Sequence, residues 1–272
     1  MSALPGPRAE AVAPPLPRHE ESAIAEAVRL VSLAQERGVA LRLLGGIAVR
    51  VRCPAWRPRQ DRVRDIDLAT RAADRREVSA YLADQGYRPD KHYNALYGRK
   101  QLYFYDDARE RALDVLVDRL EMCHVLPFAD RLVVDPATLP LADLALSKLQ
   151  IVEINRKDLV DLGVLFSSHP LGDGDGLAIN VRRVVDITAG DWGWWRTVSR
   201  NLERLQEFLV DDVAAEELDF GRPADHDAAA QVRALRDRIE TAPKSRSWKA
   251  RALLGERVRW YELPEEAEHR DT

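Results

Sequence analysis

Three aspartates on two expected strands have the residue types and the spacing of a metal-binding site. Asp65 and Asp67 open an expected strand at 65–70, and Asp114 lies in the middle of another at 112–117. Side chains two residues apart in a strand point to the same face, so Asp65 and Asp67 place two carboxylates side by side. A third carboxylate on a neighbouring strand would complete a cluster too repulsive to persist unpaired at neutral pH. Such a cluster favours Mg²⁺, which binds carboxylates, water and phosphate oxygens.

Asp118 is an alternative third ligand, because it lies on the same expected strand at an even spacing from Asp114. We favour Asp114 because it lies between apolar neighbours, where an unpaired carboxylate would be costly to bury. Taken alone, Asp65 and Asp67 are better explained by a solvated strand end at a turn. Together with Asp114 and an upstream pair of glycines, they favour a metal site.

The pair of glycines, Gly45-Gly46, lies between a short apolar stretch at 40–44 and residues 47–51, which can open a helix. A glycine turn between a strand and a helix lets backbone N–H groups approach a triphosphate, helped by the positive end of the helix. Two divalent ions about 4 Å apart can activate an attacking hydroxyl and stabilise a leaving pyrophosphate. The glycines and aspartates together therefore indicate phosphoryl-transfer chemistry.

The elements that must position these residues form an α+β pattern with a mixed sheet. Expected helices and strands alternate up to Pro140, and the periodicity is mostly helical after it. The expected strands are 40–44, 65–70, 100–105, 112–117 and an edge strand at 131–134. The first expected helix begins at Glu21 and ends before Gly38. Further helices are expected to begin at 47, 74, 141, 155, 180, 192, 226 and 246. We expect a disordered tail at 1–20, a catalytic core at 21–140 and a mostly helical domain at 141–272.

Composition limits the functional classes that the chain of 272 residues can belong to. Its net charge of −4 provides no global positive field for nucleic acid, so such binding would need a local patch. Cys53 and Cys123 have no partner spacing, which argues against a disulfide framework or a zinc knuckle, and Met122-Cys123-His124 reads as a structural segment. No apolar run is long enough to span a bilayer. We expect a soluble cytoplasmic protein without a membrane partner.

The order Gly45-Gly46, Asp65-Ile66-Asp67 and then Asp114 resembles the nucleotidyltransferase superfamily to which DNA polymerase beta belongs. Lys148-Leu149-Gln150 and Lys157-Asp158-Leu159-Val160-Asp161 are similar to a segment of AbiEii-type nucleotidyltransferases, known as toxins of toxin–antitoxin pairs. The resemblance covers roughly residues 25–166.

This resemblance implies a mixed-sheet nucleotidyltransferase core, two Mg²⁺ ions and transfer of a nucleoside monophosphate from an NTP. The acceptor would be a hydroxyl of RNA, of a protein or of a small molecule, and an antitoxin protein would be a further partner. The resemblance also implies residue roles: Asp65 and Asp67 as metal ligands, Asp114 as metal ligand or base, Gly45 and Gly46 holding the triphosphate, Lys148 beside its phosphates, and Asp158 as the later catalytic aspartate.

Two arginine-rich stretches are candidates for phosphate or RNA contacts, because guanidinium groups bind phosphates through two parallel hydrogen bonds. The first is Arg50, Arg52, Arg57, Arg59, Arg62 and Arg64. We expect Arg57 and Arg59 to contact an RNA acceptor and Arg64, beside Asp65, to contact the triphosphate. The second is Lys244, Arg246, Lys249 and Arg251 around Trp248, a pattern that suits single-stranded nucleic acid. Solvated surface is an equally good interpretation of both stretches.

Two other functional classes remain open. A glycosyltransferase also uses Asp-x-Asp to hold a metal and a nucleotide-sugar diphosphate, but it would not require Gly45-Gly46 or Asp114. A non-catalytic module on the same fold would bind a nucleotide or a partner protein, and metal would then change its stability without any transfer.

Overall fold

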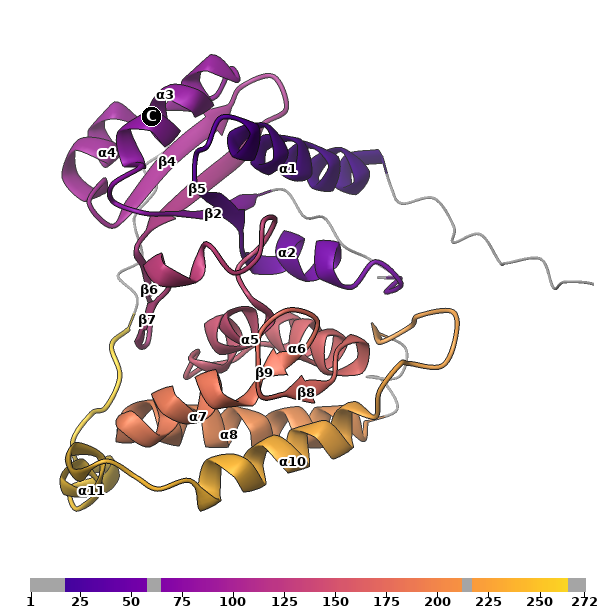
Figure 1. Cartoon of the computed structure of the whole chain (residues 1–272), viewed down its shortest axis with the longest axis vertical. Coiled ribbons are helices and arrows are strands. Elements are labelled where there is room, and N and C mark those ends of the chain that lie inside the picture. The colour runs from indigo at the N-terminus through magenta and orange to yellow at the C-terminus, as the bar shows by residue number, and fades with distance from the viewer. Residues whose placement is uncertain (1–17, 58–64, 212–216, 264–272) are drawn as a thin grey trace, which may run out of the picture.

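A mixed β-sheet forms one side of the protein and a group of helices forms the other (Figure 1). The computed structural model describes residues 18–57, 65–211 and 217–263, and within these ranges it contains ten α-helices and a five-stranded sheet. The strands are β1 (Leu41–Leu43), β2 (Ile66–Thr70), β3 (Arg88–Pro89), β4 (Gln101–Asp106) and β5 (Arg111–Val117), in the spatial order β1-β2-β5-β4-β3. The chain is therefore of the α+β class.

The centre of the sheet is a parallel pair, β2 and β5, while the other neighbouring strands are antiparallel. Apolar side chains alternate along both strands, so that Ile66 and Leu68 in β2 and Leu113 and Val115 in β5 are fully buried. The residues between them point to the opposite face, which is only partly covered. The sheet thus has one apolar face in the core and one polar face turned toward the helical half.

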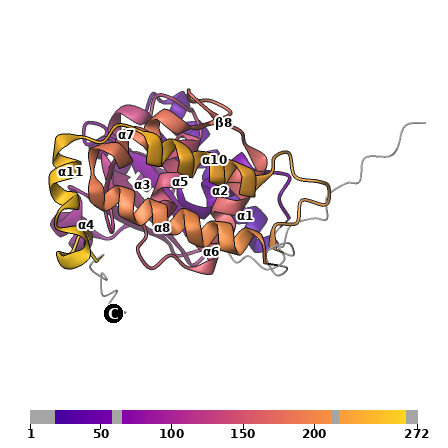
Figure 2. The ribbon, with the colours of Figure 1, turned by 90° about the horizontal axis from the view of Figure 1, so that it is seen from below.

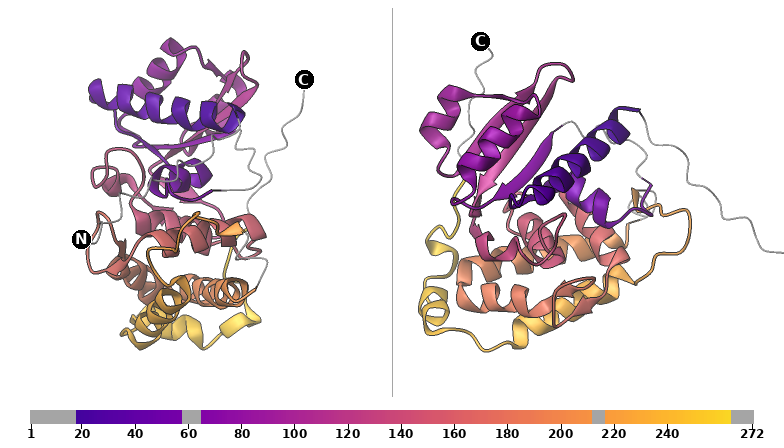
Figure 3. Two further views of the ribbon diagram at one scale, coloured as in Figure 1. Left: turned by 90° about the vertical axis from the view of Figure 1, so that its right-hand side faces the viewer. Right: turned by 45° about the horizontal axis from the view of Figure 1, so that its top comes forward.

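Helices α1 (Arg18–Glu36) and α3 (Arg75–Asp84) pack together beside the sheet (Figure 3). The Tyr81 hydroxyl donates a 2.6 Å hydrogen bond to the Leu30 carbonyl and so joins the two helices. Helix α4 (Lys91–Tyr97) lies at the outer edge of β4, where the Asn94 side chain donates to and accepts from the backbone of Tyr103. Asn94 therefore takes the place of a strand residue at this edge.

The helical half is built in layers below the sheet and contacts it mainly through the helix that follows β1 (Figure 1). Its helices are α5 (Leu141–Leu149), α6 (Arg156–Ser168), α7 (Val181–Gly190), α8 (Trp192–Leu209), α10 (Ala228–Thr241) and α11 (Arg246–Ala252), and α2 (Gly45–Arg52) lies between them and the sheet (Figure 1). From below, α8 and α10 run across the underside of the molecule (Figure 2). Four short strands form two further ladders: β6 (Arg119–Glu121) with β7 (Val125–Pro127), and β8 (Leu171–Gly172) with β9 (Ile179–Asn180).

The structure places most of the expected elements and corrects others. The hairpin at 100–105 and 112–117 is confirmed as β4 and β5, and the side chain of Asn155 caps α6 by accepting a hydrogen bond from Asp158 N. The edge strand expected at 131–134 is wrong: Arg131 N and Val134 N bond carbonyls three residues back, which makes turns. Helix α1 begins at Arg18, inside the tail expected at 1–20, and residues 1–17 lie outside the described residues. No described helix is long and apolar enough to cross a membrane.

His124 is buried in the helical half, where Nε2 lies 2.8 Å from Thr197 Oγ1 and the ring lies 5.0 Å from that of Trp194. Burial lowers the pKa of His124 from 6.5 to about 4. The unfolded chain therefore binds a proton at His124 that the folded protein excludes, and stability is lost as the pH falls through this window.

We predict that the contribution of His124 to the free energy of unfolding falls by about 2–3 kcal/mol as the pH is lowered from 6.5 to about 4. Chemical denaturation of the wild type and His124→Gln across this range measures the effect, and the variant should show the smaller slope. Burial also lowers the pKa of His169, which adds a slope of the same sign to both proteins. Equal slopes for both proteins would contradict the prediction.

Candidate active site

Asp67 and Asp114 lie directly opposite each other on the two central parallel strands. Both side chains point to the polar face of the sheet and both are half-buried. Burial, and after it the neighbouring carboxylates of Asp114 and Asp65, together raise the pKa of Asp67 to about 7. Strand pairing therefore holds two carboxylates together against their mutual repulsion.

Asp65 immediately precedes β2, and by strand alternation its side chain lies on the same face as that of Asp67. It is exposed, whereas Asp67 is half-buried. Gln101 on the neighbouring β4 donates from Nε2 to Oδ1 of Asp114 and fixes the orientation of that carboxylate. The structure thus brings the expected Asp65, Asp67 and Asp114 to one face at the centre of the sheet.

Gly45 and Gly46 lie beside this pair, at the start of α2, and they differ in their surroundings. Gly45 has a φ of +69°, and a Cβ at this position would collide with Oδ2 of Asp67. Leu44 N also donates to the backbone carbonyl of Asp67, at 3.0 Å. Gly46 faces open space, because a Cβ there would meet no atom within 4 Å. The first glycine is required by the fold, and the second leaves room beside the carboxylates.

Lys148 on α5 is half-buried and lies between two aspartates of α6. Its Nζ donates to Oδ1 of Asp158 at 2.9 Å, and it lies at the same distance from Oδ2 of Asp161 without hydrogen-bond geometry. Burial favours the neutral amine, but Asp161 and Asp158 outweigh it and raise the pKa of Lys148. Lys148 also lowers the pKa of Asp67, so α5 and α6 bring a charged cluster toward the carboxylate pair. Asp158 therefore holds Lys148 in place, and its expected catalytic role stays a prediction.

Three groups at this site were not expected from the sequence: Gln101, Tyr103 and Lys157. Tyr103 is the strand partner of Asp114, and its ring lies 6.0 Å from that of Tyr93 on α4. Lys157 is exposed at the start of α6 and lowers the pKa of Asp67 from there. A signal for Gln101 and Tyr103 was present, since both lie at alternate positions of the expected strand 100–105, on one face. For Lys157 the signal was its position directly before Asp158 in the segment 157–161, which is similar to AbiEii-type nucleotidyltransferases.

Asp118 and the first arginine stretch have structural contacts. Asp118 Oδ1 accepts a 2.8 Å hydrogen bond from Ala72 N at the far end of β5, so it does not join Asp67. Arg50 is buried, with its guanidinium over the Trp56 ring, and Arg52 bonds Asp135 and the Gly176 carbonyl. These arginines were expected to contact phosphate or RNA, and in the structure both bond other parts of the chain, Arg50 buried and Arg52 half-buried.

Arg57 lies with its guanidinium against Gly221, and its backbone N–H donates to the Asp219 carbonyl. Arg59, Arg62 and Arg64, including the expected triphosphate contact of Arg64, lie outside the described residues. The expected roles of this segment therefore stay predictions.

The second basic cluster is partly structural as well. Trp248 packs edge-on against Trp195, and the guanidinium of Arg251 lies 4.8 Å from the centre of the Trp192 ring. Lys244 bonds the carbonyl of Ile239 and leans over the Trp248 ring. Arg246 and Lys249 are exposed. The tryptophan expected as a stacking surface for nucleic acid is thus used to anchor α11.

The residues on the polar face suit a magnesium ion held by two carboxylates. In the described ranges no three His, Cys, Asp or Glu side chains are arranged to hold a metal ion together. Asp67 and Asp114 make a pair, and Mg²⁺ is commonly bound by one or two carboxylates with water and substrate phosphates at its other positions. Their repulsion and the open space at Gly46 fit such an ion with a phosphate beside it.

The chain was also compared with known proteins: no protein-family model matches it, and no curated protein matches it.

The two glycines provide a matched pair of substitutions. Gly45→Ala should lower the free energy of unfolding by roughly 1–3 kcal/mol, because it combines a strained φ with a collision at Asp67. Gly46→Ala should leave it unchanged or slightly raised, since alanine favours the helix and meets no neighbour. Denaturant unfolding of both variants measures the difference, and equal effects would mean that Gly45 is not packed against Asp67.

Asp67→Asn should stabilise the metal-free protein at alkaline pH. The proton that the folded state retains on Asp67 contributes stability that is complete below pH 3.8 and is lost as the pH rises through about 7. The variant should therefore be more stable than the wild type by roughly 1–3 kcal/mol near pH 8, and the difference should shrink toward pH 4. Asp65→Asn, at an exposed side chain, should have a smaller effect. A variant less stable than the wild type at every pH would show that repulsion at Asp67 is absent.

Proposed function

We propose that this protein is a Mg²⁺-dependent nucleotidyltransferase that moves a nucleoside monophosphate from an NTP to an acceptor hydroxyl. The observation that carries the proposal is the register of β2 and β5, which sets Asp67 directly opposite Asp114 on the polar face. A pair of carboxylates at this spacing, next to a glycine turn at a helix N-terminus, suits a metal-bound triphosphate. Asp65 would be the third carboxylate at the same face.

In this proposal Asp67 and Asp114 would hold the metal, Asp65 would be a third ligand from the same face, and Mg²⁺ would neutralise charge on the phosphates. The backbone N–H groups at the start of α2 would contact the triphosphate, in the open space that Gly46 leaves. Lys157, exposed and within electrostatic range of Asp67, would contact phosphate oxygens, while Lys148 is held by Asp158 and Asp161. Lys148 then positions α6 against the site and its charge favours the ionised form of Asp67.

The acceptor hydroxyl would attack the α-phosphorus, form a new P–O bond and expel pyrophosphate. Asp114 is the residue placed to accept the hydroxyl proton if it does not ligate the metal. Its carboxylate is oriented by Gln101, and it lies in the centre of the sheet. Catalysis in such a site comes from positioning and charge neutralisation.

The same proposal assigns residues 21–140 as the nucleotidyltransferase core and 141–272 as a C-terminal helical domain. The five strands of the sheet all precede residue 140. The acceptor would be RNA, a protein or a small molecule, and as a toxin the protein would have an antitoxin partner. A glycosyltransferase is the weaker alternative, since it gives no reason for Asp114 to face Asp67 or for a glycine to be packed on Asp67.

A non-catalytic nucleotide-binding module is the second candidate function. It is favoured by one observation: the described side chains do not gather three metal ligands. Both functions predict that nucleotide and Mg²⁺ bind, and only the transferase predicts that label from the nucleotide becomes covalently attached to an acceptor.

The test is incubation with each α-labelled NTP, Mg²⁺, total RNA and total protein, followed by measurement of the pool that acquires label. Asp67→Asn and Asp114→Asn should each lower transfer by about a hundredfold or more, because each removes a charge at the site of phosphate binding. Asp118→Asn is the matched control and should retain transfer, because its carboxylate contacts Ala72 at the other end of β5.

Full transfer by both Asp67→Asn and Asp114→Asn would overturn the assignment. Loss in Asp118→Asn with transfer retained in Asp114→Asn would move the third carboxylate to Asp118. Nucleotide-dependent stabilisation without labelling of any pool would favour the non-catalytic module.

A further inference from the structure

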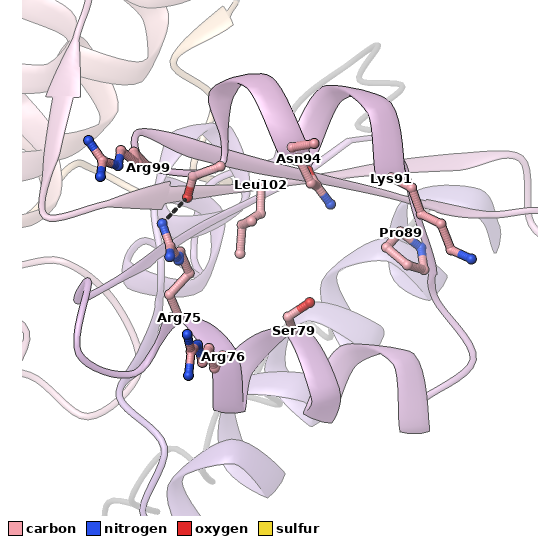
Figure 4. A pocket seen from close by; sticks show the side chains of 10 residues that line it. Arg75, Arg76, Ser79, Pro89, Lys91, Asn94, Arg99 and Leu102 are labelled. Carbon is pink, nitrogen blue, oxygen red and sulfur yellow. Dashed lines mark hydrogen bonds between the residues drawn. The ribbon is translucent and has the colours of Figure 1, made fainter.

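A cavity of about 530 Å³ opens between α3 and α4, away from the paired aspartates (Figure 4). Figure 4 shows the side chains of α3 on one side of the hollow and those of α4 and the following loop on the other. Its lining includes Arg75, Arg76, Ser79, Lys91, Arg99 and Leu102. A cavity of this volume is within the range that holds small organic ligands.

The lining contains four cations and no carboxylate. Arg75 donates a 3.0 Å hydrogen bond to the Gly98 carbonyl and so ties the end of α4 to the start of α3. Arg76, Lys91 and Arg99 are exposed. Within 18–57, 65–211 and 217–263, none of the four forms an ion pair with an aspartate or glutamate.

Other arginines around the same sheet are neutralised by carboxylates of the chain. Arg71 pairs with Asp74, Arg88 with Asp107 and Arg109 with Asp106, at 2.7–2.8 Å. Acidic residues outnumber basic ones in this sequence, 45 to 41, so carboxylates are not scarce. Four like charges around one hollow repel one another, and an anion from outside the chain would relieve that repulsion.

The cavity is separate from the paired aspartates. Leu102, which lines it, is nearly fully buried and alternates along β4 with Gln101 and Tyr103, which face Asp114. Side chains at successive strand positions point to opposite faces, so the cavity lies against the face of β4 that is turned away from Asp114. A ligand here would not occupy the place of the proposed triphosphate.

We propose that this cavity binds phosphate groups. Arg76 and Arg99 can each bind a phosphate through two parallel hydrogen bonds, and Lys91 adds a point charge. The Ser79 hydroxyl is half-buried in the lining, and Pro89 and Leu102 provide apolar contacts for the organic part of the ligand. The phosphates belong either to a compact polyphosphate compound or to the backbone of an RNA strand. The site does not depend on the proposed transferase activity.

The test measures binding of pyrophosphate and of a short fluorescently labelled RNA to the full chain, in EDTA so that no divalent ion bridges the aspartates. The wild type should bind one or both probes, and Arg76→Glu with Arg99→Glu should weaken binding by about a hundredfold. The matched control is Arg182→Glu with Arg233→Glu, which reverses two exposed arginines on α7 and α10 and changes the net charge equally. It should change affinity by less than about threefold.

Competition between the probes identifies the source of the phosphates. Displacement of RNA by pyrophosphate assigns the site to compact polyphosphates, and RNA binding without displacement assigns it to a strand backbone. Asp67→Asn should leave binding unchanged, which separates this site from the proposed active site.

If the double variant unfolds, the single variants Arg99→Gln and Lys91→Gln replace it, each with a smaller loss. If neither probe binds the wild type, or if the control variant loses as much affinity as Arg76→Glu with Arg99→Glu, the proposal is overturned.

Discussion

The repulsion between the carboxylates of Asp67 and Asp114 is the constraint on which this account of the site depends. Two parallel strands fix the pair at one register, and burial of Asp67 keeps water from screening the charges fully. If these two positions served stability alone, an apolar residue at either one would make the folded protein more stable. In the proposed function, a cation bound by both carboxylates would relieve this repulsion, and the open space at Gly46 would admit a phosphate beside it.

The helical half completes this electrostatic arrangement from the other side. Lys148 is held in α5 by two aspartates of α6, so a buried positive charge is fixed toward the polar face of the sheet. Removal of either partner would leave an uncompensated buried charge, which is strongly destabilising. The same contacts therefore join α5 to α6. They also keep the positive charge of Lys148 near Asp67, where it favours the ionised carboxylate. Lys157 is exposed on the same helix and is the cation assigned to the phosphates in the proposed function.

Local patterns in the sequence predicted the elements that carry the site, and distant contacts decided what the residues do there. Alternation around Asp114 was sufficient to predict its strand and its outward side chain, and the N-cap role of Asn155 is a local signal too. The sequence did not reveal that Arg50 is stacked on Trp56. The short helix α4 was also missed, although Asp90 caps it. Arginine on a surface and arginine in a core have the same local pattern, and only tertiary packing distinguishes them.

The most direct test of the central claim is the pKa of Asp67, measured by carboxyl-carbon NMR on the protein with and without Mg²⁺. The account predicts a pKa of about 7 without the ion, set by burial and by Asp114, and a fall of at least about one unit when Mg²⁺ is added. Asp114→Asn should lower the metal-free value and remove most of the response to Mg²⁺. A metal-free pKa near the ordinary aspartate value, or one that Mg²⁺ does not change, would contradict the account.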